Sequence, residues 1–154
     1  MGLKISKKAP NFILPSTSNK DFELSKIKKN IILYFYPKDN TPGCTLEAKD
    51  FSKLNSVIMK NKTIVVGISK DNLESHIKFK KKYNLKFQLL SDQNLKVIKK
   101  YGVWGKKSFL GKEYMGIVRS TFLIDKNRKI KRIWMNVRVK DHVKEVVNEI
   151  KKIK

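Results

Sequence analysis

Two runs constrain the fold more than any other feature of this sequence: an uninterrupted apolar run at positions 31–36, and a mostly apolar run rich in β-branched residues at 63–69. A strand with one solvent-exposed face alternates apolar and polar residues, whereas a strand buried on both faces does not. Both runs are therefore predicted to be central strands of a sheet that is covered on its two sides. A stretch with helical spacing follows each run, which indicates an α/β fold.

The helices are predicted from the recurrence of apolar residues. A helix is expected from Cys44 onward, with its apolar face formed by Leu46, Phe51, Leu54, Val57 and Ile58. Residues 69–82 are predicted to form a second helix, with Asp71 or Asn72 as its cap and Leu73 and Ile77 at helical spacing. A short strand is expected at 87–90 and a third helix at 92–101.

The last third of the chain begins with a segment punctuated by glycine. Residues 102–116 are predicted to be a loop because Gly102, Gly105, Gly111 and Gly116 interrupt them. Residues 120–125 and 130–134 are predicted to pair as a hairpin. The final helix is expected at about 140–153, with a buried stripe formed by Val143, Val147, Ile150 and Ile153.

These elements predict the fold class and the domain organisation. Residues 3–25 contain short extended pieces around turn signals, which we interpret as an N-terminal β-hairpin. The whole pattern suits an α/β, thioredoxin-like fold, in which helices flank a central mixed sheet, although Cys-x-x-Cys is missing. There is no internal repeat and no Gly/Ser-rich linker, so residues 1–154 are predicted to be one domain.

The formal net charge of +23 raises the alternative of a nucleic-acid partner. The cations are 32 Lys and only 4 Arg, spread through almost every segment, whereas Arg is the better bidentate ligand for phosphate. The polybasic run at 78–82 suits a basic nucleic-acid-associated protein with a redox-sensing thiol, which is kept as the second hypothesis. No apolar stretch is long enough to span a membrane and no secretory signal is evident, so a cytoplasmic protein is expected.

One cysteine, Cys44, excludes an intramolecular disulfide and is either a small buried hydrophobe or a reactive thiol. The predicted strand leads through a loop with Pro37 and Pro42 into a helix whose first turn contains Cys44. The free N–H groups and the positive dipole end of a first turn stabilise an anion, which favours the thiolate. Gly43 allows close approach of a small ligand, and the Thr41 hydroxyl can donate to a bound oxygen or to the sulfur.

The arrangement Pro37-x-x-x-Thr41-x-x-Cys44 resembles the signature of the peroxiredoxins. The similarity extends over nearly the whole chain, and the segments at 8–12, 34–45, 101–105 and 119–125 resemble the bacterioferritin-comigratory-protein, or peroxiredoxin Q, subfamily. The resemblance implies a thiol peroxidase that reduces hydrogen peroxide and organic hydroperoxides and needs no cofactor.

The same resemblance implies roles for individual residues. Cys44 would be the peroxidatic cysteine, oxidised to a sulfenic acid, and Thr41 would donate a hydrogen bond to the peroxide. Arg119 would favour the thiolate and polarise the peroxide, and Glu47 would accept a hydrogen bond from Arg119. Pro37 and Pro42 would screen the sulfur, and Gly43 would lie against the substrate.

The sequence departs from many members of the subfamily at one position. A resolving cysteine is common five residues after the first, where this chain has Lys49. The sulfenic acid is therefore expected to react with an external thiol such as thioredoxin, glutaredoxin or glutathione. Whether the protein is a monomer or a small homodimer stays open.

No metal or nucleotide site is predicted. His76 and His142 have no ligand-spaced partners in the sequence and are expected at the surface. Neither a Gly-x-Gly-x-x-Gly motif nor a P-loop is present.

Overall fold

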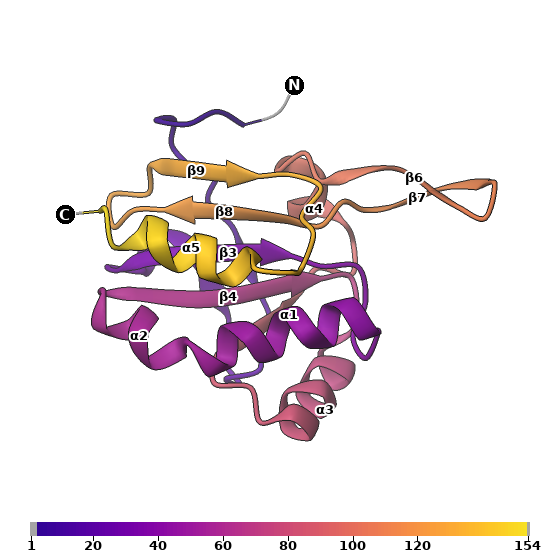
Figure 1. Ribbon diagram of the computed structural model, residues 1–154, viewed down its shortest axis with the longest axis horizontal. Coiled ribbons are helices and arrows are strands. Elements are labelled where there is room, and N and C mark those ends of the chain that lie inside the picture. The colour runs from indigo at the N-terminus through magenta and orange to yellow at the C-terminus, as the bar shows by residue number, and fades with distance from the viewer. Residues whose placement is uncertain (1–2, 154) are drawn as a thin grey trace.

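The computed structural model describes residues 3–153, and its centre is a five-stranded mixed sheet (Figure 1). The strand order is β5-β4-β3-β8-β9. β3 (Asn30–Phe35), β4 (Thr63–Ser69) and β5 (Gln88–Ser91) are parallel, whereas β8 (Ser120–Ile124) is antiparallel to β3, and β9 (Ile130–Trp134) is antiparallel to β8. The predicted central mixed sheet flanked by helices is therefore confirmed.

Both faces of the sheet are covered, as the continuous apolar runs predict. On one face, Ile32 and Tyr34 of β3 share a core with α1 (Pro42–Lys53), α2 (Asn55–Lys60), α3 (Leu73–Tyr83) and α5 (His142–Ile150). On the other face, Ile31, Leu33 and Phe35 pack with α4 (Lys96–Lys100) and the N-terminal segment. Every residue of β3 is buried, so the alternating side chains of this strand supply both cores.

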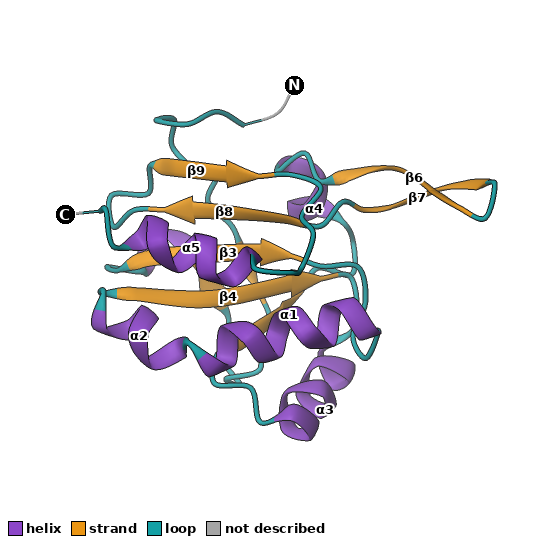
Figure 2. Cartoon of the chain, in the orientation of Figure 1, coloured by secondary structure: helices purple, strands orange, loops and turns teal. Residues whose placement is uncertain are grey.

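The N-terminal hairpin is confirmed, because β1 (Ile13–Leu14) pairs antiparallel with β2 (Phe22–Glu23), ahead of a short 3-10 helix at Leu24–Lys26. The prediction that residues 102–116 form a loop is wrong. β6 (Trp104–Phe109) and β7 (Lys112–Ile117) form a hairpin that projects beyond the sheet (Figure 2). Its two-residue turn has positive φ at Leu110 (52°) and Gly111 (79°), the conformation that matches the twist of paired strands. Glycine here marks a turn between strands.

All four predicted helices differ from their predicted bounds. The first begins at Pro42 and is interrupted at Leu54, which separates α1 from α2, and Leu46 is 50% exposed. The third is shorter than expected: α4 covers only Lys96–Lys100. The last, α5, ends at Ile150, with Val143, Val147 and Ile150 buried as predicted.

The second predicted helix, α3, starts later than expected. It begins at Leu73 because β4 continues to Ser69, and the side chain of Asn72 caps it by accepting from the Ser75 N–H at 2.8 Å. Its buried residues are His76 and Phe79, whereas Ile77 is 43% exposed.

Both histidines are buried, which corrects the expectation that they lie at the surface. His142 is 4% exposed, and its Nε2 lies 2.8 Å from the Thr121 hydroxyl on β8. His76 is fully buried among polar groups. A histidine whose partners come from distant strands leaves no pattern in the local sequence, so its burial could not be seen there.

The burial of His142 predicts a pH-dependent contribution to stability. Desolvation, together with Arg119, lowers the pKa of His142 to about 4 although Glu145 opposes it. As the pH falls below about 6.5, His142 becomes protonated in the unfolded chain but stays neutral in the folded chain. The free energy of unfolding is therefore highest above about pH 6.5 and decreases as the pH falls toward about 4. His142→Gln, which can still hydrogen-bond Thr121, should remove the effect.

Urea unfolding at about pH 7.5 and about pH 4.5 measures this contribution. We expect the native chain to lose about 2–3 kcal/mol more stability than His142→Gln across that interval. Equal losses in the two proteins would contradict the assignment.

Candidate active site

Cys44 lies where β3 delivers the chain to α1. The strand ends at Phe35, and after a six-residue loop the helix begins with Pro42 at its first position. Cys44 is the third residue of the helix and is 1% exposed. The first helical hydrogen bond runs from the Thr45 N–H to the Thr41 carbonyl, so the N–H groups of Gly43 and Cys44 precede it. The sulfur is therefore in the anion-stabilising turn that the sequence predicts.

Arg119 is brought to this turn by strand pairing. β8 begins at the next residue, and Ser120 pairs with Phe35 at the end of β3. The Arg119 Nη2 donates to the Cys44 Sγ at 3.3 Å, and its Nη1 donates to the Glu47 Oε1 at 2.7 Å. Cys44, Arg119 and Glu47, which are predicted to act together, do lie together.

The electrostatics of the three residues are set by burial. The Glu47 side chain has no exposed surface, and desolvation raises its pKa to about 7 although Arg119 opposes the shift. Burial lowers the pKa of Arg119, but Glu47 and Cys44 outweigh it, and the net direction is upward. The guanidinium therefore keeps its charge beside the sulfur, where it favours the thiolate.

Gly43 is in contact with this guanidinium. A Cβ built at Gly43 would lie 3.2 Å from the Arg119 Nη2. A side chain at this position would therefore push against the Arg119 guanidinium, which explains why a glycine fits here.

Thr41 does not contact the sulfur in this structure. Its hydroxyl donates to the Lys38 carbonyl at 2.9 Å, within the same loop. Pro42 is exposed and Pro37 is half-buried. The predicted hydrogen bond from Thr41 to a peroxide, and the screening of the sulfur by the two prolines, therefore stay predictions.

A hollow of about 340 Å³ opens beside Arg119. The residues around it come from the loop after β3, the base of the β6–β7 hairpin and the loop after β9: Pro37, Lys107, Val118, Arg119, Asn136 and Val137. Lys107 donates to the Ile117 carbonyl at 3.0 Å, and desolvation, with Arg119, lowers its pKa. Sequence reasoning missed this lysine because it assigned the hairpin to a loop.

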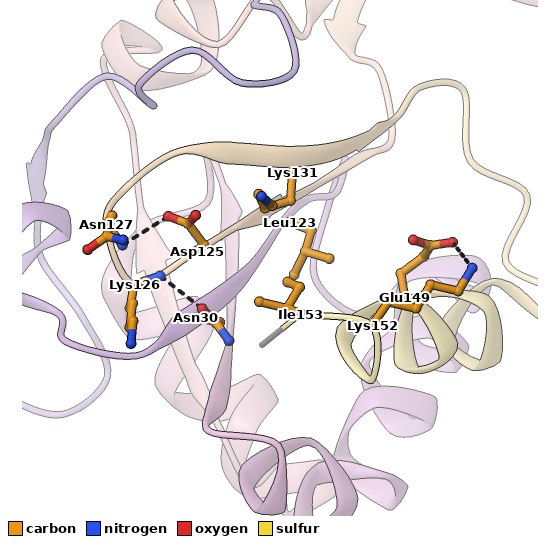
Figure 3. Close-up of a pocket in the computed structure, with 9 residues that line it drawn as sticks. All are labelled: Asn30, Leu123, Asp125, Lys126, Asn127, Lys131, Glu149, Lys152 and Ile153. Carbon is orange, nitrogen blue, oxygen red and sulfur yellow. Dashed lines mark hydrogen bonds and ion pairs between the residues drawn. The ribbon is translucent and has the colours of Figure 1, made fainter.

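Another hollow, of about 420 Å³, lies at the opposite end of the strands (Figure 3). It is lined by Asn30 at the start of β3 and by Asp125 just after β8, whereas Cys44 and Arg119 lie at the other ends of these strands. The Glu149–Lys152 ion pair, at 3.2 Å, lies at this hollow. This hollow is therefore separate from the site around Cys44.

Within residues 3–153, no helix has the length and apolar character needed to cross a membrane.

Comparisons with known proteins agree with this geometry. The model of the AhpC/TSA family matches residues 5–133. A putative peroxiredoxin bcp of Coxiella burnetii is 47% identical over 151 residues, which cover 97% of this chain and 100% of that protein. Peroxiredoxin Bcp of Bacillus subtilis is 46% identical over 98% of this chain and 97% of its own length.

Solved structures give the same result for the fold. A mutant of peroxiredoxin Q from Xylella fastidiosa superposes with a TM-score of 0.92 at 33% identity, covering 98% of this chain and 97% of that one. Xanthomonas campestris bacterioferritin comigratory protein, described with its alkyl peroxide reduction activity, has a TM-score of 0.86 at 32% identity, covering 91% and 90%. The mixed sheet flanked by helices is thus the thioredoxin-like fold of the peroxiredoxins, and the chain belongs to the AhpC/TSA family, in its Bcp or peroxiredoxin Q branch.

Proposed function

We propose that Cys44 is the peroxidatic cysteine of a single-cysteine peroxidase and that Arg119 activates it. The observation that carries the proposal is the pair of hydrogen bonds by which one guanidinium joins the Cys44 Sγ, at 3.3 Å, to the Glu47 carboxyl, at 2.7 Å. A cation fixed against a sulfur in the first turn of a helix favours the reactive thiolate.

The reaction begins with attack of the Cys44 thiolate on the terminal oxygen of a hydroperoxide. The S–O bond forms as the O–O bond breaks, so sulfur is oxidised to a sulfenic acid and the remaining oxygen leaves as hydroxide or alkoxide, which takes a proton from solvent. Arg119 and the N–H groups of Gly43 and Cys44 stabilise the charge that moves along the O–O bond. Thr41 is the proposed further donor, which requires its hydroxyl to turn away from the Lys38 carbonyl.

The sulfenic acid is reduced by a thiol from outside the chain. The sequence has no other cysteine, so an external thiol displaces water to form a mixed disulfide with Cys44, and a second thiol equivalent releases the reduced enzyme. Thioredoxin, glutaredoxin and glutathione are the candidate classes, and a cytoplasmic location fits all three. Lys49, at the usual resolving position, is exposed, with its Nζ 5.9 Å from the centre of the Tyr83 ring.

No observation favours the nucleic-acid alternative. Within the run at 78–82, Phe79 is fully buried, and Lys80 donates to the carbonyls of Leu85 and Phe87 at 2.9 and 2.7 Å. The run therefore does not form a continuous basic surface. What is left for this alternative is the generic attraction of a cationic protein to polyanions.

Arg119→Lys tests the activation of the sulfur. It keeps a positive charge but cannot hold Cys44 and Glu47 with a planar fork, so the second-order rate constant for oxidation of Cys44 by hydrogen peroxide should fall by about 100-fold. Single-turnover stopped-flow kinetics measure it. Lys49→Ala removes an exposed cation on the helix that carries Cys44, and its rate constant should stay within about twofold of that of the native chain.

Two results would contradict this proposal. One is an Arg119→Lys rate equal to that of the native chain, and the other is peroxide consumption that survives in Cys44→Ser.

The requirement for an external thiol is tested by turnover. With hydrogen peroxide alone, the chain should complete one turnover, and mass spectrometry should find Cys44 as sulfenic acid and then as sulfinic acid. Added glutathione or reduced thioredoxin should restore turnover, with a mixed disulfide on Cys44 as the trapped intermediate. Sustained turnover without added thiol would rule the single-cysteine cycle out.

A further inference from the structure

The loop that leads into the active-site helix is anchored from outside that helix. Thr41 is the N-cap of α1 but makes no side-chain capping bond, and its hydroxyl donates to the Lys38 carbonyl instead. Asn40 adopts a left-handed conformation, with φ of 65°. The first turn, which contains Cys44, therefore lacks a side-chain cap of its own. The loop before it has its buried polar contacts at Asp39, three residues before Pro42.

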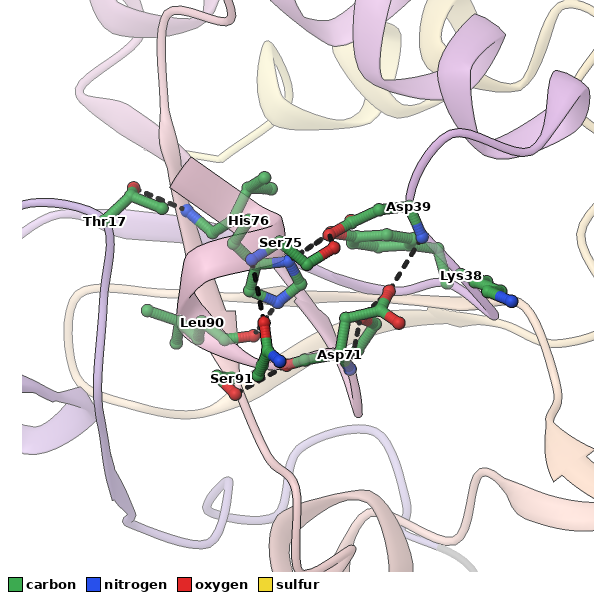
Figure 4. A network of polar contacts seen from close by, with 12 residues as sticks. Thr17, Lys38, Asp39, Asp71, Ser75, His76, Leu90 and Ser91 are labelled. Carbon is green, nitrogen blue, oxygen red and sulfur yellow. Dashed lines mark hydrogen bonds and ion pairs between the residues drawn. The ribbon is translucent and has the colours of Figure 1, made fainter. Parts of the chain in front are cut away.

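Asp39 is 5% exposed and is bonded through both its backbone and its carboxylate (Figure 4). Its N–H donates to the Asp71 Oδ2 at 2.7 Å. Its Oδ1 accepts from the Tyr36 hydroxyl at 2.6 Å, and its Oδ2 accepts from the Ser75 hydroxyl at 2.7 Å. The same Oδ2 lies 2.7 Å from the His76 Nδ1. One residue thus ties the loop to the end of β3, to the β4–α3 loop and to α3.

Both ring nitrogens of His76 face oxygen atoms that can accept a hydrogen bond. Its Nε2 lies 2.8 Å from the Leu90 carbonyl oxygen, which can only accept, so Nε2 carries a hydrogen. Its Nδ1 faces the Asp39 carboxylate. Burial raises the pKa of Asp39, but bonds from His76, Tyr36 and Ser75 outweigh it and lower the pKa overall. An ionised carboxylate can only accept, so the 2.7 Å contact is a hydrogen bond from Nδ1 to Asp39.

The resulting ion pair is fully enclosed, since the side chains of His76 and Asp39 are 0% and 2% exposed. The titratable side chains beside the ring come from three places: Asp39 in the loop, Tyr36 at the end of β3 and Asp71 after β4, whereas β5 contributes a carbonyl. Removing one partner of such a pair leaves the other charge buried and unpaired, so each partner fixes the place of the other.

The same atoms argue against a metal at this position. Single ligand atoms of Asp39, Asp71 and His76 lie within 4.8 Å of one another. A metal needs the lone pair of a ring nitrogen, and both nitrogens of His76 are engaged as donors.

We propose that His76 is a positioning residue for Cys44: as an imidazolium in α3 it holds Asp39, and through Asp39 it holds the first turn of α1 so that the sulfur lies against Arg119. This inference rests on the proposed function of Cys44. His76 does not touch the sulfur, and it acts by fixing the geometry on which the attack depends, where a small displacement is costly.

The protonation state is tested on the native chain without peroxide. The sequence contains two histidines, so ¹⁵N labelling of histidine followed by NMR at about pH 7 gives two ring systems, which His142→Gln assigns. We expect both nitrogens of His76 to show the protonated signature, and His142, whose pKa is lowered to about 4 by burial, to be neutral as an internal reference. A neutral His76 ring would overturn the proposal.

The positioning role is tested by kinetics with a matched control. His76→Gln and Asp39→Asn should each slow oxidation of Cys44 by hydrogen peroxide by about 10- to 100-fold while the circular dichroism spectrum is retained. Asn72→Ala removes the cap of α3 but leaves the ion pair in place, so it should lower the melting temperature and keep the rate within about twofold.

Each alternative outcome has a distinct meaning. Native rates in both variants of the pair, or an equal loss of rate in Asn72→Ala, would overturn the positioning role, since α3 would then act only through its general stability. If His76→Gln does not fold, Asp39→Asn carries the kinetic test. A native chain that does not react with peroxide would instead overturn the proposed function, and the NMR signature, which needs no peroxide, separates the two failures.

Discussion

The proposed chemistry of Cys44 depends on one guanidinium that is shared between two acidic groups. Arg119 bonds the Cys44 Sγ and the Glu47 Oε1 from different nitrogens, and the Glu47 carboxyl is completely buried. A carboxyl that sits in a low-dielectric interior next to a cation fixes the orientation of that cation better than solvent could. The guanidinium is therefore directed at the sulfur before a substrate arrives, so in the proposed reaction it does not have to reorient.

The sheet explains why these residues meet although 75 positions separate Cys44 from Arg119. β3 and β8 are antiparallel neighbours, so the end of β3 lies beside the start of β8, with Phe35 opposite Ser120. The residue before β8 and the helix after β3 are thus placed at the same edge. Because β3 is buried on both faces, shifting the register between these strands would disrupt two cores at once. The precision of the site is in this way inherited from the packing of the central strand.

The sequence predicted what depends on local pattern and missed what depends on distant partners. The paired strands followed from apolar runs, and the Cys44 turn followed from the strand, loop and helix pattern around it. The meeting of Cys44, Arg119 and Glu47 was implied by the resemblance to the peroxiredoxins. The β6–β7 hairpin was missed because its strands are largely exposed and therefore lack an apolar signal. The buried histidines were missed because the partners of His76 come from the loop after β3 and from β5, and that of His142 from β8. The role of Thr41 remains a prediction, since its hydroxyl faces Lys38.

In the proposed single-cysteine cycle, oxidation and reduction make opposite demands on the loop that carries Cys44. Enclosure of the sulfur, which is 1% exposed, keeps water away from the thiolate and strengthens its bond to Arg119. The same enclosure hinders the approach of any thiol larger than a peroxide to the sulfur. This chain has no second cysteine that could supply an internal thiol. Geometry that favours oxidation therefore opposes reduction, and the balance is set by how firmly the loop is held. Asp39 holds the loop through its contacts with α3. These contacts lie outside the reacting atoms, so substitutions there can change how firmly the loop is held and leave Cys44 and Arg119 in place.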